Sequence, residues 1–160
     1  MTRLNLLDKV LSIRVLVNVI EISKKSKERD FKRSSMGRFM ERLRCNLHPS
    51  AFLLDCHSFP LDLSDVDVCI GYNEDWSRPE DEILFQTKAV FESFGFKTGL
   101  NHPYSNSISP AMPFTYPSMM IELNKKTYMG KSGELDSARM AIVVSSLQRV
   151  YGLILDREQM

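Results

Sequence analysis

Two side chains that can exchange protons, Asp55 and His57, stand two residues apart directly after the apolar run 52–54. A short apolar run of this kind predicts a buried strand, in which residues two apart face the same side. His57 could then hold a metal ion or shuttle a proton, with Asp55 beside it. The alternative is a capped strand whose histidine is only hydrogen-bonded, and this segment alone does not decide between the two.

Two further polar clusters accompany apolar runs later in the chain. The segment 101–104 (Asn-His-Pro-Tyr) follows one run, and Glu122 and Asn124 interrupt another. A carboxylate in an apolar run costs free energy unless it is paired or used. Open α/β sheets bind ligands at the carboxyl ends of their strands, so three such clusters together indicate a functional site.

The elements that must position these residues alternate between strands and helices. Apolar residues that alternate or run continuously predict strands, and apolar residues at helical spacing predict helices. The predicted strands are 51–55, 66–70, 96–100 and 119–124, and the predicted helices are 36–47, 77–94 and 135–154. Residues 4–22 fit both periodicities, and their β-branched residues favour a strand from about Ile13. This order predicts an α/β layered domain with a largely parallel sheet.

Local signals refine this assignment. Residues 77–80 (Ser-Arg-Pro-Glu) form a predicted capping box, and Gly95 is a predicted helix stop. Residues 105–117 carry prolines without periodicity and are predicted to be a long loop, which is often functional. The last helix is predicted to bury Leu135, Ala138, Ile142, Val143, Leu147, Val150 and Ile154.

Composition limits the function classes. The chain has 160 residues, 43% apolar and 26% charged, which predicts one globular domain. A net charge of +1 gives no overall footprint for nucleic acid, and the basic run 24–33 is interpreted as a solvated connector rather than a phosphate patch. Three cysteines without C-x-x-C spacing predict neither a disulfide framework nor a cysteine-rich zinc module, so the cytoplasm is the simplest setting. The apolar stretch 10–22 is too short and polar for a membrane span.

The segments that carry these clusters resemble the N-formylglutamate amidohydrolase family. Residues 55–60 (Asp-Cys-His-Ser-Phe-Pro) are similar to its Asp-x-His-Ser segment, and Ile70-Gly71 is similar to its Val/Leu-Gly-Asp-Arg segment. Residues 94–104 resemble its Gly-Tyr-x-Val…Asn-x-Pro-Tyr segment, and 121–129 resemble its Ile-Glu-Ile-Asn-Arg…Leu-Tyr-Met segment. The four matches keep the family's order and cover roughly residues 36–155, the C-terminal three quarters of the chain.

The resemblance implies a three-layer α/β/α domain of the phosphorylase/hydrolase type, similar to the zinc-dependent carboxypeptidases. It implies zinc-dependent hydrolysis of a linear amide, in which N-formyl-L-glutamate and water give L-glutamate and formate. Glu122 would be the general base or acid. His57 would be a zinc ligand with Asp55 behind it. His102, beside the matched Asn-x-Pro-Tyr segment, could be recruited as a further ligand, although the resemblance does not imply it. The substrate side would be lined by Ser58, Asn101, Tyr104, Asn124 and Lys125.

The chain also departs from the family pattern. Residues 1–35 match the family poorly, so the family-like domain is predicted to be 36–160, apparently without the family's N-terminal part. Only His57 is matched as a ligand, whereas catalytic zinc usually has three protein ligands, which predicts weak zinc binding. Lys125 replaces the family's arginine and is a poorer carboxylate clamp.

Two functions remain open at the level of sequence. One is a divergent or truncated amidohydrolase acting on a small N-acyl amino acid. The other is a non-catalytic remnant that binds a small acid or another subunit. Partners expected besides the substrate are a second copy or another chain covering an exposed edge, with neither nucleic acid nor a membrane.

Overall fold

The computed structural model describes residues 28–130 and 132–157, which form a four-stranded sheet with helices. The elements in chain order are α1 (Glu28–Asn46), β1 (Leu53–Phe59), β2 (Val68–Tyr72), α2 (Asp81–Ser93), β3 (Thr98–Leu100), β4 (Ser118–Asn124), η2 (Lys125–Thr127) and α3 (Ser137–Arg157). The strand order is β1-β4-β2-β3. The pairs β1–β4 and β2–β3 are parallel and β2–β4 is antiparallel, so the predicted mixed, largely parallel sheet is confirmed.

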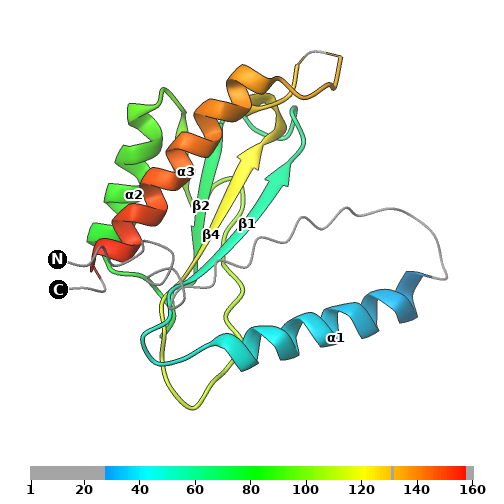
Figure 1. Cartoon of the computed structure of the whole chain (residues 1–160), viewed down its shortest axis with the longest axis vertical. Coiled ribbons are helices and arrows are strands. Elements are labelled where there is room, and N and C mark those ends of the chain that lie inside the picture. Colours follow the sequence, from blue (N-terminus) through cyan, green and yellow to red (C-terminus); the bar gives the residue numbers. More distant parts are fainter. Residues whose placement is uncertain (1–27, 131, 158–160) are drawn as a thin grey trace, which may run out of the picture.

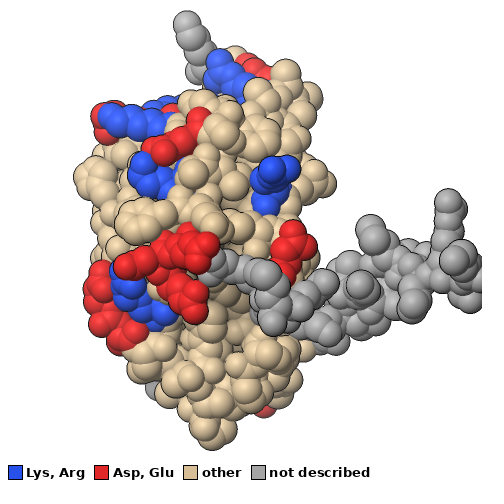
Figure 2. Space-filling view, turned by 90° about the vertical axis from the view of Figure 1, so that its left-hand side faces the viewer, with Lys and Arg blue, Asp and Glu red and all other residues tan. Residues whose placement is uncertain are grey.

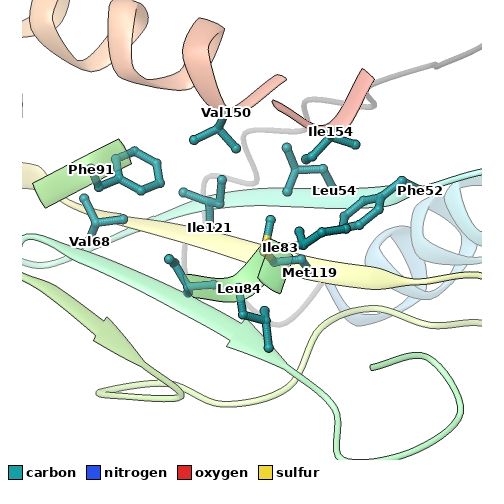
Figure 3. Packing of buried hydrophobic residues seen from close by; sticks show 11 residues of the cluster. Phe52, Leu54, Val68, Ile83, Leu84, Phe91, Met119, Ile121, Val150 and Ile154 are labelled. Atoms are coloured by element: carbon teal, nitrogen blue, oxygen red, sulfur yellow. The ribbon is translucent and has the colours of Figure 1, made fainter. Parts of the chain in front are cut away.

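One face of the sheet is covered by α2 and α3, which lie side by side (Figure 1). The core lies between these helices and the sheet, and Figure 3 shows Val150 and Ile154 of α3 close above Leu54 and Ile121 of the strands. Its buried members are Phe52, Leu54, Val68, Ile70, Ile83, Leu84, Phe91, Met119, Ile121, Val150 and Ile154. Strand residues alternate between the two faces of the sheet. Because Leu54 is buried on the face covered by the helices, Asp55 lies on the opposite face.

The opposite face, which we call the loop face, carries Asp55 and His57 and is covered by the segment after β3. Two glycines let this segment lie directly on the sheet. A Cβ at Gly99 would come 2.5 Å from the carbonyl oxygen of His102, and one at Gly71 would come 2.6 Å from that of Asn106. Glycine is therefore required at both positions, because no other residue leaves room for the backbone to approach so closely.

The C-terminal half of α1 packs against the start of β1 and the segment that precedes β4. Leu43 of α1 packs with Leu53 and Tyr116 in a second, smaller core, while the rest of α1 extends away from the sheet (Figure 1). α1 begins at Glu28, earlier than the predicted start at residue 36. The strand predicted within residues 4–22 lies outside the described residues.

The predicted C-terminal ends of β1 and β2 came too early, and β2 also begins at Val68 rather than at residue 66. β1 runs on to Phe59 instead of ending at Asp55, and β2 continues through Gly71 to Tyr72. His57 therefore lies within β1, as Asp55 does, and not after it. The extension has a physical cause: β4 pairs with β1 along its whole length, and this pairing satisfies the backbone despite polar side chains.

The predicted capping box was wrong, whereas the predicted helix stop is confirmed. The N-cap of α2 is Glu80, without a side-chain cap hydrogen bond. Ser77 is instead buried and donates from Oγ to Oδ1 of Asp75 at 2.7 Å. Gly95 has a φ of +86°, the left-handed conformation that ends a helix.

The buried face of α3 is only partly the predicted one. Val143, Val150 and Ile154 are buried, but Leu135 and Ile142 are 59% and 45% exposed. Leu135 precedes the helix, and Ile142 is one residue, about 100° of helical rotation, away from Val143. By length and composition alone the segment Ser137–Asp156 could cross a membrane, a test that core helices also pass, and here its buried residues pack on the sheet.

The described residues on the outer side of the helical layer carry charges of both signs. Figure 2 shows lysine and arginine side chains next to aspartate and glutamate side chains, separated by uncharged surface. Several of these neighbours are ion pairs, among them Arg78 with Glu74 and Asp81, and Lys88 with Glu92. This side therefore offers no extended electrostatic surface for a polyanion.

Candidate acid–base site

An imidazole–carboxylate pair lies on the loop face of β1. Nε2 of His57 is 2.7 Å from Oδ1 of Asp55, and both side chains are largely shielded from solvent. The hydrogen bond to Asp55 raises the pKa of His57, burial opposes this shift, and the negative charges of Asp55 and Glu122 add to it. His57 therefore keeps its proton at higher pH than a free imidazole does, and Asp55 fixes the orientation of the ring.

Glu122 lies directly beside this pair. β4 is the strand between β1 and β2, and Glu122 is the register partner of His57 on one side and of Cys69 on the other. Burial raises the pKa of Glu122, the positive charge of His57 opposes the shift, and the negative charge of Asp55 adds to it. Its Oε2 atom is buried and has no hydrogen-bond partner among the described residues. Glu122 thus has an acceptor that the described fold does not use.

Tyr104 reaches this group from the loop that crosses the sheet. Its ring packs edge-on against Phe59 at 5.8 Å, and its carbonyl oxygen accepts a hydrogen bond from Sγ of Cys69 at 3.1 Å. Burial and the charges of Glu122 and Cys69 raise the pKa of the Tyr104 hydroxyl. Burial also raises the pKa of Cys69, so its thiol stays protonated and is not a nucleophile at neutral pH.

The sequence prediction missed Phe59 and Cys69 as neighbours of the site. A signal was present for both. Cys69 alternates with Val68 and Ile70, which are buried on the helix side, and Phe59 stands two residues after His57. Extending the strand periodicity one step further would have placed both on the loop face.

Two of the predicted substrate-lining residues use their side chains within the fold. Oδ1 of Asn101 accepts a hydrogen bond from the backbone N–H of Tyr72 at 2.8 Å. Asn124 is fully buried, and its amide nitrogen donates to three carbonyl oxygens of the loop after β1, those of Leu61, Ser64 and Val66. The bond of Asn101 fixes the segment after β3 to the end of β2, and the bonds of Asn124 fix the end of β4 to the loop after β1.

The other predicted residues lie around the cluster. Ser58 is the register partner of Leu123, which packs on the helix side, so it lies on the face opposite His57. Lys125 is exposed at the start of η2. His102 is exposed, and its backbone passes over Gly99. Among all the predicted residues, the structure brings together Asp55, His57, Glu122 and Tyr104.

The donor set does not fit a zinc ion. Within residues 28–130 and 132–157, no three His, Cys, Asp or Glu side chains are arranged to hold a metal. Nε2 of His57 already contacts Asp55, and Cys69 is buried against a backbone carbonyl. Catalytic zinc usually needs three protein ligands and an open position.

Two cavities lie away from the cluster. One of about 620 Å³ lies beside Phe52, Trp76 and Tyr116, and one of about 670 Å³ lies between α2 and α3. None of the residues of the acid–base cluster lines either of them. We assign the site from its chemistry, since neither cavity gathers groups that exchange protons in this way.

The domain is a mixed α/β sheet that carries, on one face, an imidazole–carboxylate pair and a carboxylate with one buried oxygen that has no hydrogen-bond partner among the described residues. The family model described as N-formylglutamate amidohydrolase matches residues 33–129, which is more than half of the 160 residues. The chain belongs to the N-formylglutamate amidohydrolase family.

Solved structures share the fold. The N-formylglutamate amidohydrolase from Ralstonia eutropha JMP134 is 18% identical with a TM-score of 0.54, over 78% of this chain and 49% of its own. The gene product Atu2144 from Agrobacterium tumefaciens is 16% identical with a TM-score of 0.51, over 82% of this chain and 51% of its own. The chain thus spans about half the length of these structures. No curated protein matches it.

Proposed function

We propose that this chain is an amidohydrolase that acts on a small N-acyl amino acid, the substrate type of its family. The observation that carries the proposal is the placement of Glu122, whose buried Oε2 has no partner among the described residues, in register with His57. A carboxylate of raised pKa is a better proton acceptor than a free one, and an imidazole of raised pKa holds a proton to give. Family membership supports hydrolysis of an amide as the reaction.

The proposed steps use the side chains of this chain. Water attacks the carbonyl carbon of the amide while Glu122 accepts a proton from that water. The protonated His57, held by Asp55, donates a hydrogen bond to the oxygen on which negative charge develops. The C–N bond then breaks, the leaving nitrogen takes a proton from Glu122, and the products are the free acid and the amine. For N-formyl-L-glutamate these are formate and L-glutamate.

Zinc is a separate part of the proposal. Bound zinc would polarise the carbonyl and lower the pKa of a bound water. The described side chains do not fit a zinc site, so no step above is assigned to the metal. We expect zinc to bind weakly through His57. We take the cytoplasm as the setting because it keeps the three cysteines reduced.

A second candidate is a non-catalytic domain that binds a small acid or another subunit. One observation favours it: the described part of the chain lacks a metal-holding group of side chains. In this case the cluster would still bind a ligand, but Glu122 would transfer no proton.

Formate release distinguishes the two candidates. Purified chain is incubated with N-formyl amino acids, and formate is measured over time without and with added zinc. Glu122→Gln keeps the shape but deletes the proton acceptor, and we expect turnover to fall at least about 100-fold. The matched control is Glu41→Gln, an exposed position on α1, which should leave turnover unchanged. Absence of formate release by the native chain under both conditions would contradict the hydrolase and favour the binding domain.

A further inference from the structure

Four residues, one from each strand, stand in a single row across the sheet. Cys69 of β2 is the register partner of Gly99 on β3 and of Glu122 on β4, and Glu122 is the partner of His57 on β1. Register partners on neighbouring strands point to the same face of a sheet. Cys69 therefore lies on the loop face directly beside Glu122, on the side away from His57.

The thiol of Cys69 contacts the backbone of the segment that crosses the loop face. Its Sγ donates a hydrogen bond to the carbonyl oxygen of Tyr104 at 3.1 Å. Burial raises the pKa of Cys69, and hydrogen bonds with the backbone of Tyr104 and His102 oppose this shift. The carbonyl oxygen of His102 also lies so close to Gly99 that a Cβ there would come within 2.5 Å of it. The backbone of residues 102–104 is therefore held against the row at Gly99 and Cys69.

From this backbone, the side chain of Tyr104 reaches across the sheet to β1. Its ring packs edge-on against Phe59, with 5.8 Å between the ring centroids. Burial and the charge of Glu122 raise the pKa of its hydroxyl, so the hydroxyl lies within electrostatic range of that carboxylate. Phe59 is 1% exposed, whereas Tyr104 is 36% exposed. The Tyr104 ring is thus supported by a buried side chain and still presents surface to a ligand beside Glu122.

The fold itself does not require a hydrogen-bond donor at position 69. Cys69 is fully buried, and a buried cysteine usually behaves as a small apolar residue with a weak S–H donor. An apolar residue of similar size would fill the same space. The thiol adds one directed contact, and the residue that receives it is Tyr104.

We propose that Cys69 is a positioning residue, whose thiol holds Tyr104 so that the tyrosine ring forms one wall of the substrate site beside Glu122. The inference rests on the proposed amide hydrolysis and adds to it a residue that does not touch the substrate. A wall contacts the substrate in the ground state and in the transition state alike. Its loss should therefore raise KM and leave kcat nearly unchanged.

Three variants of Cys69 separate the hydrogen bond from the space that the thiol fills. Cys69→Ser keeps a donor, Cys69→Val fills the space without a donor, and Cys69→Ala does neither. Formate release is measured with the N-formyl amino acid that the native chain turns over fastest, and folding is checked by circular dichroism. We expect KM to rise at least about threefold in Cys69→Val and Cys69→Ala, with kcat within about twofold of native, and Cys69→Ser to remain near native.

The matched control is Cys56→Ala. Cys56 packs on the helix side of β1, where its Sγ lies 4.0 Å from the hydroxyl of Tyr151, so its loss should leave KM unchanged. A native KM in Cys69→Val, or equal losses in Cys69→Ser and Cys69→Ala, would overturn the hydrogen bond as the cause.

A double-variant cycle tests whether Cys69 acts through Tyr104. Tyr104→Ala removes the wall and should raise KM by itself. In that background Cys69→Ala should raise KM by less than about 1.5-fold, because no ring is left to position. The same rise in both backgrounds would overturn the inference and leave the proposed hydrolysis intact.

Fluorine NMR reports on the ring without turnover. The chain is labelled with 3-fluorotyrosine, and the signal of Tyr104 is assigned with Tyr104→Phe. We expect this signal to shift in Cys69→Ala and Cys69→Val, and to keep its native position in Cys69→Ser and Cys56→Ala. If the native chain releases no formate, the proposed hydrolysis fails, and the spectra decide on the positioning of Tyr104 alone. An identical signal in all three Cys69 variants would overturn it.

Discussion

His57 and Glu122 are direct register partners on the adjacent parallel strands β1 and β4. Both therefore project from the loop face at the same height, with Asp55 hydrogen-bonded to His57 at 2.7 Å. The pKa of each is raised, that of His57 chiefly by its hydrogen bond and that of Glu122 chiefly by burial. An acid–base pair built on two strands is held more rigidly than one built on loops, so its consequences can be tested residue by residue.

The first prediction concerns Asp55→Asn. Removing the charge of Asp55 should lower the pKa of His57, because the hydrogen bond to the carboxylate is the largest cause of its upward shift. An NMR titration of the ring protons of His57 measures this directly, with His57→Gln used to assign the resonance. An unchanged pKa would mean that the contact does not form in solution.

The same pair predicts a pH dependence of stability. A histidine whose folded pKa is raised contributes stability below its unfolded pKa, about 6.5, and loses this contribution as the pH rises through the folded pKa. The native chain should therefore exceed Asp55→Asn in unfolding free energy by more at pH 6 than at pH 9. Urea unfolding at both values measures the two differences, and a larger difference at pH 9 would contradict the account.

Glu122 should affect stability in the direction opposite to His57, because its negative charge at neutral pH destabilises the fold. Its folded pKa is raised, so folding becomes less favourable as the pH rises from the unfolded pKa through the folded one. Glu122→Gln should be more stable than the native chain at pH 7 and nearly equal at pH 4, while its turnover is lost. Thermal unfolding at both values checks this, and a variant destabilised at pH 7 would show that Glu122 is paired.

Gly99→Ala tests the close approach of the segment after β3 to the loop face of the sheet. The new Cβ would meet the carbonyl oxygen of His102, a backbone atom that cannot turn aside, and we expect a loss of about 1–3 kcal/mol in unfolding free energy. Gly152→Ala is the matched control, because nothing lies within 4 Å of its Cβ in α3 and alanine should stabilise the helix by about 0.5–1 kcal/mol. Equal effects of the two variants on unfolding by denaturant would contradict the close approach.

Zinc content gives a further prediction. The one histidine of the cluster should bind zinc weakly, so dialysed protein should hold less than one equivalent by metal analysis. His57→Ala should abolish the binding that remains, and Glu122→Gln should preserve it. Stoichiometric zinc that survives both dialysis and His57→Ala would show that other residues form the metal site.

The sequence predicts those parts of the site that follow from the local alternation of residues along a strand. The two-residue spacing of Asp55 and His57 predicts that they share one face, and Glu122 is marked by its position as a carboxylate in an apolar run. The segments of the fold with clear periodicity, such as β4 and α3, were predicted within a few residues. These properties depend on neighbours along the chain, which a single sequence contains.

The parts that could not be predicted depend on contacts between distant residues. From the sequence, Asn124 is only a polar residue at a strand end. In the fold its side-chain nitrogen donates hydrogen bonds to three carbonyl oxygens of a loop about sixty positions earlier. The sequence pattern predicts Ser77 to be a helix cap, but its hydroxyl donates a hydrogen bond to the carboxylate of Asp75 instead. The return of Tyr104 over the sheet requires space at Gly71 and Gly99 that only the three-dimensional fold defines. Hydrogen-bond partners of a polar side chain are set by tertiary structure, so its type alone does not separate binding from structural roles.

The most direct test of a single catalytic unit is a double-variant cycle on kcat/KM for the N-formyl amino acid that the native chain turns over fastest. His57→Gln and Glu122→Gln are measured alone and together, with folding checked by circular dichroism. If the two residues act in one step, the double variant should lose about as much kcat/KM as the more damaging single variant, since the second change removes nothing further. Losses that multiply in the double variant, or single variants that retain native turnover, would contradict the account.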